Sequence, residues 1–123
     1  MAEPRAYRNF IDGEWVESKA RKTFENGSPT DRGDVIGTFQ DSDALDVGAA
    51  TEAARRAYKR WRLVPAPKRA EYLFRMGEIL VKRKDEYARE MTREMGKPLK
   101  EARGDVQEAI DVCYYIAGEG RRL

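Results

Sequence analysis

Few side chains in this sequence have the type and spacing that catalysis or ligand binding requires. The single cysteine, Cys113, could supply a thiolate nucleophile, but the 123-residue chain contains no histidine that could activate it. Cys113 lies within an apolar pattern at helical spacing, where a free cysteine is commonly a buried core residue. We therefore expect no catalytic residue in this chain. The lack of histidine also excludes a Ser-His-Asp triad and a histidine-ligated zinc site.

Charged side chains give no stronger signal for a ligand. Glu108 and Asp111 share one helical face, but two carboxylates alone do not define a cation site. The run Lys82-Arg83-Lys84 could contact phosphate, but Asp85 follows at once, so a solvated helix face is the better interpretation. The glycines match neither a dinucleotide-binding turn nor a P-loop. The residues by themselves predict no cofactor-binding site.

Composition limits the class of protein. Charged residues make up 37% of the chain, and 24 basic against 22 acidic residues leave a net charge of only +2. This balance argues against a nucleic-acid partner or an anionic membrane surface. No apolar run is long enough to span a bilayer, and residues 1–5 lack the apolar core of a signal peptide. We expect a cytoplasmic protein, and one cysteine, which forbids an internal disulfide, fits that compartment.

The first part of the chain, residues 1–40, has the pattern of short strands joined by tight turns. Asp12-Gly13 is the strongest short signal for a two-residue type I′ hairpin turn. Strands are predicted at residues 7–11, 14–17, 23–26 and 35–39. Clusters of Asn, Gly, Ser, Pro and Asp separate the last two. We therefore predict a β-hairpin followed by short strands.

The remainder, residues 41–123, has helical periodicity. Ser42 is the predicted N-cap of a helix that ends before Pro65. The apolar stripe of this helix is Val47, Ala50, Ala54, Ala57, Tyr58 and Trp61. The small alanines on the stripe indicate close approach to another surface. The chain is thus predicted to be mixed α/β, with strands in residues 1–40 and helices in residues 41–123.

A helical hairpin is predicted for the rest of the chain. Its first helix begins at Pro67 and either breaks near Asp85 or continues to Met95, because periodicity allows both. Gly96 suits the left-handed position that ends a helix, and Pro98 suits the start of the next. The final helix carries one predicted apolar face of Ala102, Val106, Ala109, Cys113 and Ile116.

Short motifs in a fixed order resemble the beginning of the aldehyde dehydrogenase superfamily. They are Phe10–Trp15, Ser28-Pro29, Asp34–Gly37, Ala53–Trp61, Pro67–Arg69, Glu94–Pro98 and Tyr114–Gly118. Their order and spacing follow the family from Tyr7 onward, with Ser28-Pro29 where the family usually has Asn-Pro. The segment 105–115 is most similar to the semialdehyde dehydrogenase branches, such as those that act on α-ketoglutarate or aminoadipate semialdehyde.

The resemblance implies an enzyme that uses NAD or NADP to oxidise an aldehyde to a carboxylate. In the family a cysteine thiolate attacks the aldehyde, hydride passes to the nicotinamide, and a glutamate-activated water releases the acid. These groups, and the glycine turn that meets the cofactor, lie beyond the position that matches Leu123. The resemblance therefore implies the first part of a cofactor-binding domain, residues 41–123 being one incomplete domain. This chain alone would be inactive, and Cys113 does not match the nucleophile.

Three site residues follow from the resemblance alone. A structural monovalent cation in the family would correspond to the backbone carbonyl of Gly27 and the carboxylate of Glu94. Glu108 corresponds to a position at the aldehyde entrance, where its charge could favour a substrate carrying an amino group. The implied partners are a small aldehyde, the remainder of the dehydrogenase polypeptide and further copies of the same protein.

Two other functions remain open. Apolar helix faces without a partner suit a non-catalytic helical interaction module derived from such an enzyme. A cluster of basic residues on one helix suits a weak nucleic-acid binder, namely Arg55, Arg56, Lys59 and Arg60. Mixed charge and the lack of an aromatic stacking surface argue against the second of these. In either case, large apolar side chains left in water would make the isolated chain marginally stable or prone to self-association.

Overall fold

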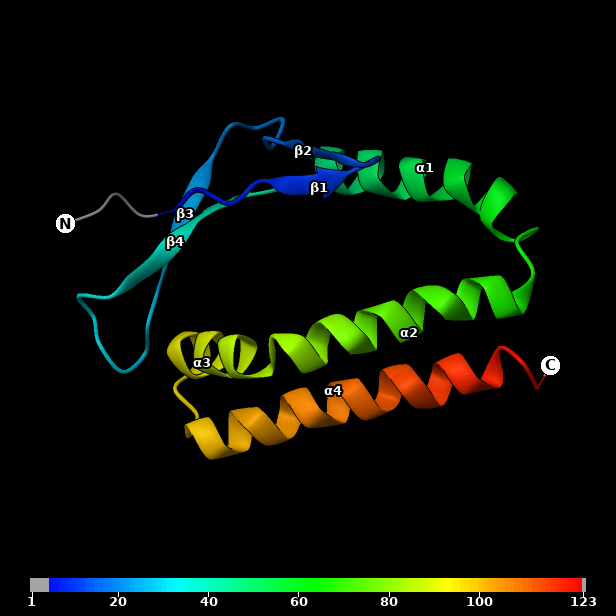
Figure 1. Ribbon diagram of the computed structural model, residues 1–123. Helices are drawn as coiled ribbons and strands as arrows, with labels where there is room; N and C mark the ends of the chain where they lie inside the picture. The colour runs from blue at the N-terminus through cyan, green and yellow to red at the C-terminus, as the bar shows by residue number, and fades with distance from the viewer. Residues whose placement is uncertain (1–4, 123) are drawn as a thin grey trace. The chain divides into compact units, whose positions relative to one another are not determined.

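A computed structural model describes residues 5–122 of the chain. The chain divides into two compact units, Met1–Leu63 and Val64–Leu123. The first unit holds the strands and one helix, and the second holds the remaining helices (Figure 1). This arrangement confirms the predicted mixed fold of short strands followed by helices. The assignment of residues 41–123 to one incomplete domain stays a prediction.

The first unit begins with the predicted hairpin. Strands β1 (Asn9–Ile11) and β2 (Glu14–Val16) pair antiparallel, with Phe10 opposite Trp15. The two turn residues, Asp12 and Gly13, have φ values of 55° and 86°. A type I′ turn requires positive φ at both central positions, and aspartate and glycine tolerate this better than most residues. The turn prediction is confirmed, although both strands are shorter than expected.

A second antiparallel pair consists of β3 (Thr23–Gly27) and β4 (Val35–Gln40). The segment before β1 runs parallel to β4, because the Tyr7 N–H donates to the Thr38 carbonyl at 2.8 Å. Gly37 permits this approach, since a Cβ there would lie 2.6 Å from the Arg5 carbonyl oxygen. The strands thus form two separate two-stranded sheets.

Helix α1 (Ala44–Trp61) corrects the predicted N-cap. The capping residue is Asp43, whose side chain accepts from the Leu45 N–H at 2.8 Å and forms a capping box with Asp46. Ser42 is not the cap, because its hydroxyl instead accepts a hydrogen bond from Asn9 Nδ2 at 2.8 Å. The helix therefore starts one residue later than expected, and Asp46 in its first turn accepts hydrogen bonds from Ser18 and Lys19 in the segment between β2 and β3.

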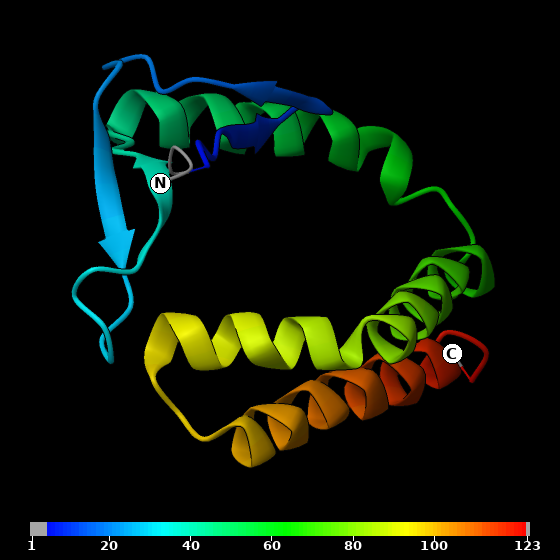
Figure 2. The same cartoon turned by 60° about the vertical axis from the view of Figure 1, so that its left-hand side comes forward.

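The second unit is a helical hairpin with a break in its first arm. Helices α2 (Ala66–Lys82) and α3 (Lys84–Met95) meet at Arg83, so the open question of a break or a continuous helix is settled as a break. Gly96 ends α3 with φ 75°, as predicted, and Pro98 precedes α4 (Leu99–Glu119). Helices α2 and α4 run side by side in two views (Figures 1 and 2).

The core of the second unit lies where α3 and α4 meet. Its buried members are Ala88, Ala102, Val106 and Ile110. Further along, Gly77 of α2 lets the Tyr114 ring approach, since a Cβ would lie 3.0 Å from that ring. The predicted face of α4 is partly wrong. Ile110 and Ala117 are buried, whereas Ala109 is exposed and Ile116 keeps 47% of its surface accessible.

Candidate functional site

The most tightly bonded group of side chains in the first unit lies at the start of α1. Ser18 Oγ donates to Asp46 Oδ2 at 2.7 Å, and the Lys19 N–H donates to Asp46 Oδ1 at 3.0 Å. Both Ser18 and Asp46 are buried. The Lys19 N–H, followed by the Ser18 hydroxyl, lowers the pKa of Asp46 below its ordinary value. The lowered pKa favours the carboxylate anion, whose hydrogen bonds connect the start of α1 to the segment after β2.

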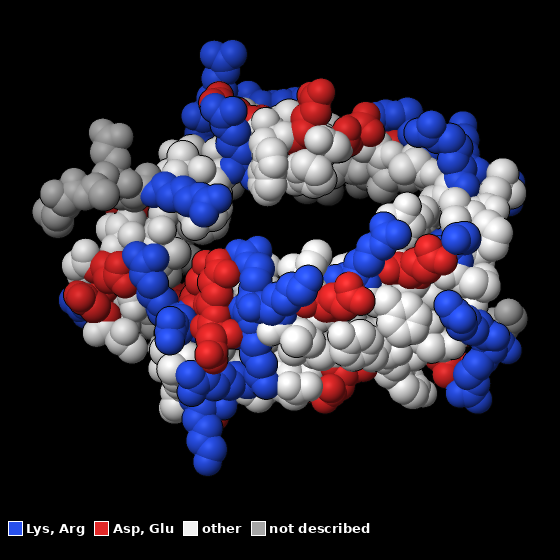
Figure 3. All heavy atoms as spheres, viewed as in Figure 1, with Lys and Arg blue, Asp and Glu red and all other residues white. Residues whose placement is uncertain are grey.

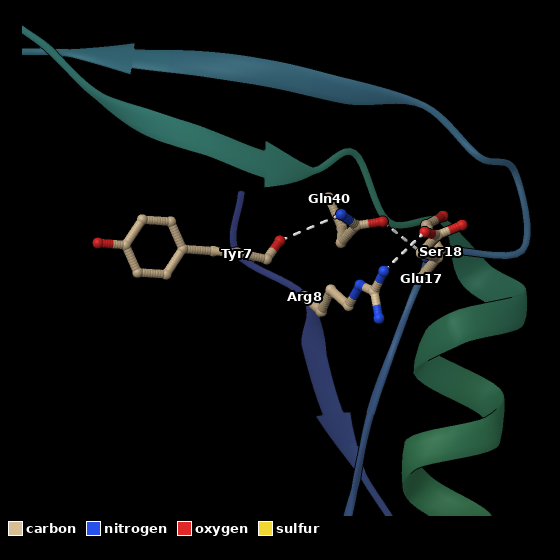
Figure 4. A network of polar contacts seen from close by, with 5 residues as sticks. All are labelled: Tyr7, Arg8, Glu17, Ser18 and Gln40. Atoms are coloured by element: carbon tan, nitrogen blue, oxygen red, sulfur yellow. Dashed lines mark hydrogen bonds and ion pairs between the residues drawn. The ribbon is translucent and has the colours of Figure 1, made fainter. Parts of the chain in front are cut away.

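Gln40 links this group to the first strands (Figure 4). The Ser18 N–H donates to Gln40 Oε1 at 2.8 Å, while Gln40 Nε2 donates to the Tyr7 carbonyl at 3.1 Å. Beside it, Arg8 and Glu17 form an exposed ion pair at 3.3 Å. The sequence favoured Ser42 as the cap, and nothing in it indicated Ser18 or Gln40, because long-range pairing leaves no local pattern.

Two adjoining hollows lie between the β1–β2 hairpin and α1. One has a volume of about 260 Å³ and the other about 330 Å³. They are lined mainly by apolar side chains of the hairpin and of the α1 stripe, among them Phe10, Ile11, Val47, Ala50, Ala54 and Ala57. Phe10 and Val47 are each more than half exposed. An open apolar surface of this kind suits coverage by another protein segment better than it suits catalysis.

Helix α1 is therefore amphipathic, but its predicted apolar stripe is exposed. Within α1 only Asp46 and Ala53 are buried, and Tyr58 keeps 62% of its surface accessible. The small residues of the stripe line the hollows and are not covered by a neighbouring element. Periodicity identified the apolar face, but the surface that should cover it is not among the described residues of this unit.

Gly27 and Glu94 fall in different units. Gly27 ends β3 next to a register shift, and its neighbour Ser28 donates its N–H to the Asp34 carbonyl at 2.9 Å. Glu94 lies in the last turn of α3 and is exposed. Because the two positions lie in different units, the pairing of Gly27 with Glu94 stays a prediction. No group of three or more potential metal ligands occurs within residues 5–122.

Glu108 and Cys113 both lie on α4. Glu108 is exposed, whereas Cys113 is half-buried beside the helix core. Neither is accompanied by a histidine, which the sequence lacks altogether. The interpretation of Cys113 as a packing residue stays a prediction.

In the second unit, every carboxylate whose pKa is shifted has that pKa lowered. A hydrogen bond from Arg103 lowers the pKa of Asp85, and one from Arg83 lowers that of Glu86. Lys97 and Asp105 form a further ion pair across the turn between α3 and α4. A general acid needs a raised pKa, which burial or a like charge would provide. The Arg103–Asp85 pair links α4 to α3, whereas the Arg83–Glu86 pair lies within the start of α3, and neither carboxylate has the raised pKa of a general acid.

The arrangement of strands also bears on cofactor binding. The named strands pair only antiparallel, and no strand leads through a glycine-rich turn into a helix within residues 5–122. A dinucleotide site of the usual kind needs such a turn at the end of a parallel strand. The described residues therefore do not form a dinucleotide site by themselves. None of the helices in this described range is long and apolar enough to cross a bilayer.

Comparison with known proteins identifies the class of protein to which this scaffold belongs. The sequence profile of the aldehyde dehydrogenase family matches residues 15–123. The chain belongs to the aldehyde dehydrogenase family, as the ordered motifs predicted.

Individual relatives place the chain more closely. It is 40% identical over 122 residues to the α-ketoglutaric semialdehyde dehydrogenase of Bacillus subtilis, covering 99% of this chain and 25% of that protein. The structure matches an NAD-dependent aldehyde dehydrogenase from Sinorhizobium meliloti with a TM-score of 0.91 and 31% identity, over 98% of this chain and 24% of that one. It also matches an E. coli NADP-dependent enzyme with a TM-score of 0.89 and 33% identity, over 95% and 24% of the two chains.

The chain thus spans about a quarter of the length of the curated relatives it matches. It corresponds to their amino-terminal segment, and the fold is that of the same segment in the solved structures. The catalytic region of the family lies outside the residues that this chain matches. These findings confirm the predicted family, the predicted segment and the similarity to semialdehyde dehydrogenases.

Proposed function

We propose that this chain supplies the amino-terminal scaffold of a dehydrogenase that oxidises an aldehyde, of the semialdehyde class, to a carboxylate. The observation that carries the proposal is 40% identity to a semialdehyde dehydrogenase over 99% of this chain. The exposed apolar surface between the hairpin and α1 supports it, because such a surface requires cover. The remainder of the dehydrogenase polypeptide is the proposed cover.

NAD or NADP is the proposed oxidant of the whole enzyme. The solved relatives include one named as NAD-dependent and another named as NADP-dependent, so the choice between the coenzymes stays open. We assign no cofactor contact to this chain, because its described strands pair only antiparallel and none leads through a glycine-rich turn into a helix. Its own contribution is to hold α1 and the helical hairpin in place through the Asp46 and Lys97–Asp105 contacts.

Two site assignments belong to this proposal. We assign the Gly27 carbonyl and the Glu94 carboxylate to a structural monovalent cation, since hard cations prefer oxygen ligands. We assign Glu108, exposed on α4, to the path of the aldehyde, where its charge would disfavour an acidic substrate. The proposed setting is a cytoplasmic homo-oligomer that binds neither nucleic acid nor membrane.

A chimera tests the activity. Residues 1–123 of this chain would replace the matched segment of the Bacillus subtilis relative, and reduction of NAD and NADP would be followed by absorbance with α-ketoglutaric semialdehyde. We expect the chimera to be active, and both the isolated chain and the relative lacking its own segment to be inactive. Turnover by the isolated chain, or a folded chimera without activity on any semialdehyde, would contradict the proposal.

The same chimera tests the two site assignments. Glu108→Gln is expected to increase kcat/KM several-fold for an acidic semialdehyde and to leave that for a neutral aldehyde unchanged. Glu94→Gln is expected to abolish any increase of the thermal midpoint on addition of potassium or sodium chloride, relative to choline chloride. An unchanged specificity ratio would refute the first assignment, and an unchanged salt response the second.

A further inference from the structure

The turn of the β1–β2 hairpin consists of an aspartate followed by a glycine, Asp12-Gly13. In such a pair the main-chain nitrogen of the glycine can attack the side-chain carboxyl carbon of the aspartate, because glycine has no Cβ to hinder the approach. The turn leaves this nitrogen accessible. Both residues are exposed, and a Cβ at Gly13 would meet no atom within 4 Å. The strand pairing closes between Ile11 and Glu14, so the turn itself lies outside the ladder.

An ion pair with α1 holds the side chain of the reactive aspartate. Arg56 Nη2 donates to Asp12 Oδ2 at 2.9 Å, although both side chains are more than half exposed. Closing a ring onto the Gly13 nitrogen requires the Asp12 carboxyl group to rotate towards the main chain. The contact with Arg56 restricts this rotation, so the structure contains both a reactive pair and a group that restrains it.

The same ion pair fastens the tip of the hairpin to α1. The hairpin lies along α1 (Figures 1 and 2), and its other polar link to the start of this helix is the hydrogen bond from Asn9 Nδ2 to Ser42 Oγ at 2.8 Å. The two apolar hollows lie between these attachments. The hairpin is therefore attached near both ends of the hollows, and the attachment at the tip depends on the Asp12 carboxylate.

The other place where asparagine or aspartate precedes glycine is held in a different way. Asn26 and Gly27 belong to β3, where they pair with Gly37 and Val35 of β4. Strand pairing keeps this main chain extended, which opposes ring closure between neighbouring residues. At Asp12-Gly13 no ladder restrains the main chain, so the side-chain contact with Arg56 matters more there.

We propose that Asp12 is a site of spontaneous isomerisation to isoaspartate and that Arg56 slows the reaction. The Gly13 nitrogen forms a bond to Asp12 Cγ, and a carboxylate oxygen leaves as water with the amide hydrogen and one proton from solution. The product is a five-membered succinimide ring. Water then opens this ring: attack at Cγ restores aspartate, whereas attack at the main-chain carbonyl carbon leaves the chain running through Cβ and Cγ. Water is released and then taken up, so isomerisation needs no oxidant or reductant.

Isomerisation would detach the tip of the hairpin from α1. It adds one carbon atom to the main chain between Asp12 and Gly13, which a two-residue type I′ turn does not accommodate. It also replaces the side-chain carboxylate that Arg56 binds with a carboxylate attached directly to Cα. The Asn9–Ser42 hydrogen bond would remain, so the hairpin would stay attached at one end of the hollows only.

The three residues involved, Asp12, Gly13 and Arg56, belong to one unit of this chain. Their reaction does not depend on the proposed dehydrogenase activity. It should therefore occur in the 123-residue chain and also in the chimera with the Bacillus subtilis relative, which carries the same turn and the same arginine.

Incubation at mildly acidic pH followed by peptide mapping tests the site. Isoaspartate at residue 12 would be quantified by chromatography and mass spectrometry in the native protein and in R56Q, both folded and in concentrated urea. We expect folded R56Q to react about two- to fivefold faster than the folded native protein, the range that loss of one exposed ion pair allows. In urea the two should react at the same rate, because the contact is then absent from both.

Two further variants serve as controls. R55Q removes the same charge from α1, but Arg55 pairs with Glu52, so this variant should react as the native protein does. Charged side chains of both signs are visible over the first unit (Figure 3), so the loss of one arginine changes its overall charge only slightly. D12E lengthens the side chain and cannot close a five-membered ring, so it should give no product at this position.

The chain and the chimera are both measured, and circular dichroism identifies the folded samples. Equal rates for native protein and R56Q in a folded sample of either would overturn the role of Arg56. Absence of isoaspartate at residue 12 in folded R56Q, while the samples in urea accumulate it, would overturn the site itself. Hydrogen exchange should be faster in β1 and β2 after isomerisation, and unchanged exchange would contradict detachment of the hairpin.

Discussion

At the scale of single residues, the first unit depends on one buried carboxylate. Asp46 accepts hydrogen bonds from Ser18, from the Lys19 N–H and from its own N-cap residue, Asp43. These donors come from the loop after β2 and from the residue before α1. Removing the charge would leave the buried Ser18 hydroxyl and two part-buried N–H groups without a strong acceptor, which costs more than the bonds themselves contribute. The hydrogen bonds that Asp46 accepts therefore decide how α1 is held against the strands.

This dependence predicts an effect of pH on stability. The pKa of Asp46 is lower in the folded chain than its ordinary value of about 3.9, first because of the Lys19 N–H and then because of Ser18. A lowered folded-state pKa stabilises the fold above that ordinary value, and the contribution is lost as the pH falls towards the folded-state pKa. We expect Asp46→Asn to be less stable than the native chain at pH 7, and the difference to shrink as the pH falls below the ordinary pKa of aspartate towards the folded-state pKa.

Urea unfolding at a series of pH values would measure this convergence. Glu25→Gln, a change on the exposed part of β3, serves as the control and should follow the native curve. The pKa values of Asp85 and Glu86 are also lowered, by hydrogen bonds from Arg103 and Arg83, so these carboxylates contribute to the pH dependence of both proteins. The quantity that matters is therefore the difference between the curves. A constant difference from pH 7 to pH 3 would show that the charge of Asp46 is not what stabilises α1.

At the scale of elements, turns were easier to predict than helix faces. Asp12-Gly13 and Gly96 were located correctly because positive φ restricts the choice of residue at a single position. The apolar face of α4 was predicted as one stripe centred on Ala109 and Cys113. In the structure this stripe lies between two faces, one packed against α2 and α3 and the other exposed. When a helix has two apolar faces, the periodicity of its sequence is the average of both. It therefore predicts a single apolar face that lies between them.

Two glycine substitutions test the role of backbone conformation in the hairpin. Gly96 has φ 75°, so Gly96→Ala forces an alanine into the left-handed region and should destabilise the chain by about 1–2 kcal/mol. Gly104 lies inside α4, and a Cβ there would meet no atom within 4 Å. Gly104→Ala should therefore stabilise the chain by about 0.5–1 kcal/mol. Chemical denaturation would measure both, and the same sign for the two substitutions would refute the argument.

At the scale of the whole molecule, the chain leaves much apolar surface in water. Exposed large side chains occur in both units, including both tryptophans: Trp15 is 65% exposed and Trp61 42%. Full burial of one such side chain contributes roughly 1.5–3 kcal/mol, whereas a domain is stable by only about 5–15 kcal/mol in total. A few uncovered side chains therefore decide whether the isolated chain is well folded.

We expect tryptophan fluorescence to report whether the apolar surface of the first unit is covered by the rest of a dehydrogenase. Since both tryptophans are in the first unit, the isolated chain should emit as solvent-exposed tryptophan does and should be quenched readily by acrylamide. It should also bind an apolar dye strongly, because large apolar side chains are exposed in both units. In the chimera, Trp15 and Trp61 should become less accessible to acrylamide than in the isolated chain. Low dye binding with a sharp monomeric thermal transition in the isolated chain would contradict this expectation.

The sequence alone determined the local elements and the family. Turn residues, caps and apolar periodicity act over a few positions, so the hairpin at Asp12-Gly13 and the helix end at Gly96 could be identified without a structure. Only the tertiary structure decided that Asp43 caps α1, that Ser18 and Gln40 fasten it, and which face of α4 is buried. Those choices depend on residues far apart in the chain, whose contacts leave no periodic signal. The sequence encodes each apolar face, but which partner covers it depends on packing in three dimensions.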